Sequence, residues 1–99
     1  MRVDDYNVIF EVTTYVDMFK RKAVLAIEKE TGELYADVTI NLPQYSLDEG
    51  ESFLSADCPE LIKEMVENGY LEIVGDIQVS FGRYKIGKFT QKFIDEFES

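Results

Sequence analysis

Cys58 is the one residue of this sequence whose side chain could act as a strong nucleophile. It lies in the segment Asp57-Cys58-Pro59-Glu60, which is typical of a helix start, and the N-terminus of a helix lowers the pKa of a thiol. The chain has no histidine to accept the thiol proton and no second cysteine to resolve an oxidised sulfur. We therefore interpret Cys58 as a small apolar residue that packs at the start of the helix.

The same two counts exclude several classes of site. One cysteine and no histidine rule out structural zinc, iron–sulfur ligation, an internal disulfide and any catalytic triad built on histidine. We expect no metal and no cofactor.

Carboxylates are the most abundant reactive groups, with twenty acidic and ten basic residues and a formal charge of −10. A close pair could perform glycosidase chemistry, but sugar-binding clefts are usually lined with aromatic side chains and tryptophan is absent. The loop Asp48-Glu49-Gly50-Glu51 lacks the glycine and glutamate spacing of an EF-hand. We interpret that loop as solvated.

The acidic residues concentrate in segment 28–76, which holds thirteen acids and two bases. Solubility explains many such runs, and the functional alternative is a face that binds a basic partner. Its sharpest form is mimicry of nucleic-acid phosphate, which requires a continuous stripe of carboxylates. The expected protein-binding face comprises Glu30, Glu33, Asp37, Asp48, Glu49, Glu51, Glu60, Glu64 and Glu67. The same charge disfavours direct binding of nucleic acid or anionic membrane.

Segment 77–92 carries only basic charges. They are Arg83, Lys85, Lys88 and Lys92, and aromatic residues lie between them. Such a pattern on a strand can form a nucleic-acid platform. Because the aromatics alternate as core residues do, we favour a strand with one buried face and a basic face that meets acids.

Hydrophobic periodicity predicts the elements that position these groups. Residues 6–16 alternate as a strand, with its inward face at Tyr6, Val8, Phe10, Val12, Thr14 and Val16. Residues 23–28 and 34–42 predict a hairpin that turns at Gly32. Its second strand turns Leu34, Ala36, Val38, Ile40 and Leu42 inward.

A helix is predicted to begin after Asp57, whose side chain would cap it together with Glu60. Its apolar face comprises Leu61, Ile62, Met65 and Val66. Asn68-Gly69 ends it. Two strands follow from Leu71, separated by a break at Gly75-Asp76, and Thr90–Glu98 forms a short helix capped by Thr90.

Together these elements predict a single α+β domain over residues 1–99. We expect a mostly antiparallel sheet of about five to six strands, with one central helix and a short C-terminal helix.

Several blocks of the chain resemble a domain-of-unknown-function family of small proteins encoded on bacterial mobile elements such as conjugative transposons and plasmids. The blocks are Tyr35 to Pro43, Leu47 to Gly50, Asp57 to Leu61 and Glu67-Asn68-Gly69. The resemblance implies no catalytic residue. It implies a bacterial context in which a small acidic protein modulates host or element machinery.

We therefore expect a non-enzymatic, cytoplasmic accessory protein that binds a basic protein partner, with DNA mimicry as one form. The cytoplasmic prediction rests on the lone cysteine and on an acidic N-terminus without a signal-like apolar run. One alternative is a self-associating module that pairs through a free edge at Tyr6–Val16 or Tyr84–Phe89. The other is a small enzyme that uses carboxylates or Cys58. The sequence leaves the oligomeric state open between monomer and homodimer.

Overall fold

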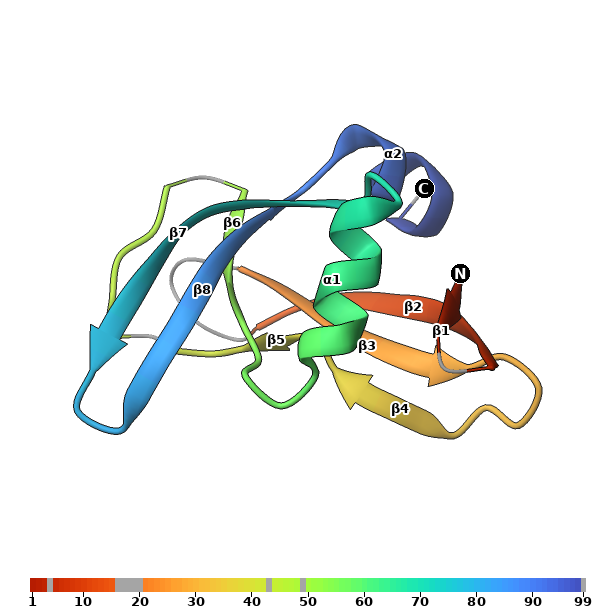
Figure 1. Ribbon diagram of the computed structural model, residues 1–99. Coiled ribbons are helices and arrows are strands. Elements are labelled where there is room, and N and C mark those ends of the chain that lie inside the picture. Colours follow the sequence, from red (N-terminus) through yellow and green to blue (C-terminus); the bar gives the residue numbers. More distant parts are fainter. Residues whose placement is uncertain (4, 16–20, 43, 49, 99) are drawn as a thin grey trace.

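The computed structural model describes residues 1–3, 5–15, 21–42, 44–48 and 50–98. Its strands form two antiparallel sheets of four strands each (Figure 1). The first has the order β1-β2-β3-β4, with β1 at Arg2–Val3, β2 at Tyr6–Thr14, β3 at Lys22–Glu28 and β4 at Leu34–Asp37. The second has the order β5-β6-β8-β7, with β5 at Thr39–Ile40, β6 at Glu51–Leu54, β7 at Leu71–Val79 and β8 at Gly82–Phe89. The α+β class and the mostly antiparallel pairing are confirmed. The expectation of one sheet of about five to six strands is wrong, because the strands divide into two sheets.

The chain passes from one sheet to the other at Val38, between β4 and β5. The Val38 amide donates to the Val24 carbonyl at 3.0 Å, and its carbonyl accepts from the Ser55 amide at 2.9 Å. Because one residue bonds to both sheets, regular pairing is interrupted there. The strand predicted over 34–42 is therefore divided into two short strands.

Leu34 points outward and is 57% exposed, although the alternation predicted an inward side chain. The pairing of β3 with β4 shifts register between Ala26 and Ile27, which places Leu34 opposite Ile27. A shift of one residue moves a side chain to the other face of a sheet. Val38 and Leu42 are buried as expected.

The strand predicted over 6–16 is confirmed over Tyr6–Thr14. Val8 and Phe10 are buried, whereas Tyr6 is exposed. Val16 lies outside the described residues.

Helix α1 spans Pro59–Glu67 and buries Leu61, Ile62 and Met65. The expected cap at Asp57 is wrong, because Cys58 is the N-cap residue and no side chain caps the helix. The Asp57 amide instead donates to Ser55 Oγ at 3.2 Å.

The predicted end of α1 is confirmed. Gly69 has φ +78°, which favours glycine, and its amide donates to the Val66 carbonyl at 3.1 Å. The Tyr70 amide donates to the Met65 carbonyl at 2.9 Å. These two bonds form a Schellman motif, which reverses the chain into β7.

β7 is continuous, so the break predicted at Gly75-Asp76 is wrong. The register with β8 shifts between Ile73 and Gly75, which is a β-bulge rather than the end of a strand. Figure 1 shows the β7–β8 hairpin reaching away from the C-terminal helices, with α1 between this hairpin and the first sheet.

The C-terminal segment forms α2 over Gln91–Phe93 and a π-helical turn, η1, over Ile94–Glu98. The predicted cap is confirmed, since Thr90 Oγ1 accepts from the Phe93 amide at 3.3 Å. The Phe93 ring is fully buried, with its centroid 5.6 Å from that of Phe10 and 4.7 Å from that of Phe89. Phe93 therefore joins the inner faces of both sheets.

A buried arginine, Arg21, bonds to the segment that follows β5. Arg21 Nη1 donates to the Leu42 carbonyl at 3.0 Å, Nη2 donates to the Tyr45 carbonyl, and the guanidinium lies 5.2 Å from the Phe53 ring centroid. These bonds satisfy a charge that would be costly to bury alone. None of the helices in the described ranges is long and apolar enough to cross a membrane.

Candidate functional site

The acids of the expected binding face fall into three groups. Glu30 and Glu33 lie at the turn between β3 and β4, and Asp37 ends β4. Glu30 accepts a hydrogen bond from Asn7 Nδ2 at 2.7 Å, and this bond lowers the pKa of Glu30. The first group therefore borders the first sheet.

The second group, Asp48 and Glu51, lies at the start of β6. Glu51 is in register with Lys88, and its Oε1 accepts from the Asp48 amide at 3.1 Å. Glu49 lies outside the described residues. Figure 1 shows this loop and the β3–β4 turn at opposite ends of the molecule.

The third group is Glu60, Glu64 and Glu67, which lie along α1. The helix starts beside a depression of about 380 Å³ lined in part by Tyr35, Cys58 and Glu60. The described acids of the expected face thus lie on several elements, and the start of α1 adjoins β4 at this depression.

Cys58 borders that depression but has the wrong electrostatic setting for a nucleophile. It is 8% exposed, and its thiol donates to the Asp37 carbonyl at 3.4 Å. Burial raises its pKa, and the charges of Asp57 and Asp37 add to this effect, against a hydrogen bond with Ser55 that lowers it. The neutral thiol is therefore the favoured form.

The outer face of the first sheet carries an apolar row. Ile9, Ile27 and Leu34 are cross-strand neighbours on β2, β3 and β4. The next row across the same strands is Glu11, Leu25 and Asp37. Because cross-strand partners share a face, these six side chains form one surface with an apolar centre and two carboxylates beside it. We call it the outer face.

The outer face is open to solvent. Ile9 is 39% exposed and Leu34 is 57% exposed. Within the described ranges, the helices pack on the opposite side of the sheet, where Phe10 meets Phe93 and Phe97. An exposed apolar patch rimmed by charge is typical of an interaction surface.

A second feature is a groove of about 470 Å³ between α1 and the β7–β8 hairpin. Leu54, Pro59, Ile62, Val66, Ile73 and Tyr84 supply most of its apolar lining. Val66 and Ile73 are 39% and 41% exposed. Val66 was predicted on the apolar face of the helix, and like Ile62 of that face it lines this groove.

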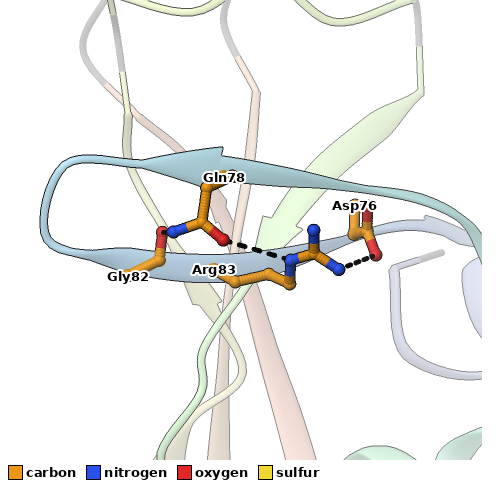
Figure 2. A network of polar contacts seen from close by, with 4 residues as sticks. All are labelled: Asp76, Gln78, Gly82 and Arg83. Carbon is orange, nitrogen blue, oxygen red and sulfur yellow. Dashed lines mark hydrogen bonds and ion pairs between the residues drawn. The ribbon is translucent and has the colours of Figure 1, made fainter.

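Three cations line the same groove, namely Lys63, Arg83 and Lys85, together with one acid, Glu67. Figure 2 shows how the hairpin holds Arg83. Its Nη1 lies 3.4 Å from Asp76 Oδ2, and its Nε donates to Gln78 Oε1 at 3.3 Å. The interpretation of the basic segment as a strand that meets acids is thus supported for Arg83.

The described residues hold no cluster of three or more carboxylates and thiols that could bind a metal. Sequence reasoning missed both the outer face and the groove. Two weak signals for them existed: Leu25 and Ile27 on the second face of β3, and Val66 at the margin of the apolar face of α1.

No model of a known family matches the chain, and the searches of curated proteins and of solved structures found no match either.

Proposed function

We propose that this protein is a non-enzymatic binding module whose outer face docks on a partner protein. The partner would present an apolar patch bordered by lysine or arginine side chains. The observation that carries the proposal is the row of exposed Ile9, half-buried Ile27 and exposed Leu34 beside Glu11 and Asp37.

The chemistry of this surface suits a protein partner. Apolar side chains at the centre of an interface supply burial, and the polar rim supplies specificity. Glu30 and Glu33 extend the negative rim at the adjacent turn. A formal charge of −10 would also steer a basic partner toward the molecule.

A basic protein fits this arrangement better than the DNA-binding cleft of an enzyme. Phosphate mimicry requires a continuous stripe of carboxylates, whereas the described acids of the expected face are divided among the β3–β4 turn, β4, the start of β6 and α1. Binding of a basic protein partner requires only a local acidic rim on the outer face.

Symmetric self-association fits the outer face less well. In an isologous dimer the same patch meets itself, which would bring Glu11 and Asp37 toward their copies and cost free energy. Of the second expected edge, Tyr84–Phe89, residues Ile86–Lys88 pair with β6 on one side and with β7 on the other, so they are not free to pair with a second copy.

The test is a comparative capture from a lysate of the source organism. Tagged wild-type protein is compared with Leu34→Ser, with Asp37→Lys and with the control Phe81→Ser, whose ring is 61% exposed in the β7–β8 turn. We expect a protein that wild type and the control retain, and that both outer-face variants lose by about tenfold.

Raising the salt concentration should weaken the capture by wild type, because it screens the acidic rim. Circular dichroism spectra of all variants should match that of wild type. Equal capture by the outer-face variants and wild type would contradict the proposal.

A further inference from the structure

We propose that the groove between α1 and β8 binds an extended acidic segment of a second protein, which adds as a strand beside residues 82–85. This site lies apart from the outer face and does not depend on the function proposed above. Three independent observations point to it: an open strand edge, an apolar floor and a local excess of positive charge.

The strand edge is open because β6 ends early. The ladder between β6 and β8 stops at the pair Phe53 and Ile86, after which the chain leaves toward α1. Among the described residues, residues 82–85 pair only with β7. An extended segment can bond to such an edge through its backbone, as in β-augmentation.

The floor beside this edge is apolar. Ile62 and Val66 on α1 face Ile73 on β7 across the groove. Leu54 at the end of β6 and Pro59 at the start of α1 line it as well. Its volume of about 470 Å³ is within the range of binding sites for small groups. One or two apolar side chains of the added segment would cover Val66 and Ile73.

The lining of the groove holds more cations than acids, in contrast to the molecule as a whole, and Asp76 outside the lining pairs with Arg83. The chain carries −10 overall, yet three cations and one acid line this groove. Within the described part of the chain, Lys63 and Lys85 make no ion pair. The occupant that complements this site is therefore acidic.

Arg83 has a donor left for such a segment. Asp76 and Gln78 hold its Nη1 and Nε, as Figure 2 shows. Its Nη2 donates to none of the described residues. A carboxylate at this position would accept a charge-assisted hydrogen bond from a guanidinium that the hairpin already orients.

The geometry of a strand sets the expected motif. Side chains two residues apart share a face, so an apolar residue followed by acids at the second and fourth positions after it would face α1 together. The probe is a fluorescent peptide of sequence Ser-Leu-Thr-Glu-Thr-Glu-Ser. The control peptide has lysine in place of both glutamates.

Fluorescence polarisation measures binding of the probe to wild type, to Lys85→Glu, to Lys63→Glu and to Val66→Ser. Lys29→Glu is the matched control, because it makes the same charge change at an exposed position outside the groove lining. We expect each charge reversal to weaken binding about tenfold, and Lys29→Glu by less than about twofold. Val66→Ser should weaken binding without changing its dependence on salt.

Amide hydrogen exchange separates strand addition from simple charge attraction. The probe should slow exchange within residues 82–85, whereas the lysine peptide should not. Leu34→Ser should leave probe binding unchanged, so a failure of the outer-face proposal would not affect this result.

Three outcomes would overturn the proposal. The first is no binding of the probe up to about 1 mM, and the second is equal loss with Lys29→Glu and Lys85→Glu. The third is displacement of the probe by dodecanoate, with no slowing of amide exchange in residues 82–85. That result would assign the groove to a small amphiphile.

Discussion

A thiol at the start of a helix is ordinarily acidified, but the surroundings of Cys58 reverse this tendency. The side chain is buried, and the nearby charges of Asp57 and Asp37 disfavour a thiolate. At the residue scale, burial and neighbouring charge outweigh the dipole of a helix of nine residues. Cys58 therefore serves packing between α1 and β4, where its thiol donates to the Asp37 carbonyl.

We predict that Cys58 reacts slowly with iodoacetamide in the folded protein. At pH 8 the rate should be roughly tenfold or more below that of the chain in urea, because the thiolate is disfavoured and the sulfur is shielded. Mass spectrometry of timed samples measures the rate, and Cys58→Ser is the unreactive control. Equal rates in the folded and unfolded chain would contradict this prediction.

The same raised pKa has a consequence for stability. The folded state holds the thiol proton more tightly than the unfolded state, whose pKa is near 9.0. Burial of the neutral thiol therefore costs no deprotonation below pH 9. As the pH rises above that value, the unfolded chain loses the thiol proton first, and the free energy of unfolding is expected to fall.

At the scale of elements, β8 is the strand on which the second sheet depends. It pairs with β6 and β7, and Gly87 lies where both ladders meet. A Cβ at this position would lie 2.8 Å from Leu54 Cδ1 and 3.0 Å from Leu71 Cδ1. Both leucines are buried, so neither can move aside freely.

We predict that Gly87→Ala lowers the free energy of unfolding by about 1–3 kcal/mol, because it overpacks the contact of β8 with these leucines. Gly75→Ala is the matched control in the same sheet. Its Cβ would meet only Ile86 Cδ1, at 3.9 Å. Urea unfolding followed by circular dichroism measures both variants, and equal stability of the two would refute the packing argument.

At the scale of the whole molecule, one cluster of aromatic rings holds the two sheets together. Phe93 contacts Phe10 of the first sheet and Phe89 of the second, and Phe97 contacts both Phe10 and Tyr70. The C-terminal segment is thus part of the core. A salt bridge from Lys22 to Glu98 at 2.6 Å fastens its end to β3.

We predict that Phe93→Ala lowers the free energy of unfolding by about 3–5 kcal/mol, because it leaves a cavity between the sheets. Since both sheets share this ring, near- and far-ultraviolet circular dichroism should change in a single transition for wild type. Phe81→Ala, at an exposed ring, should change stability by less than about 0.5 kcal/mol. Separate transitions for wild type would show that the sheets fold independently.

The amino-acid sequence by itself determined the local structure of this protein. Period-two patterns placed β2 and the β3–β4 hairpin, Gly69 ended α1, and Thr90 capped α2. These features depend on neighbours in the chain, so their signals are local. Composition alone also excluded histidine chemistry and disulfides.

Only the tertiary structure decided where the candidate surfaces lie. The register shift at Ile27 turned Leu34 outward, the bond between Val38 and both sheets divided one strand, and the early end of β6 opened the edge of β8. Each of these results from pairing between distant segments, which a one-residue shift can invert. The outer face and the cationic groove exist because of such long-range pairing.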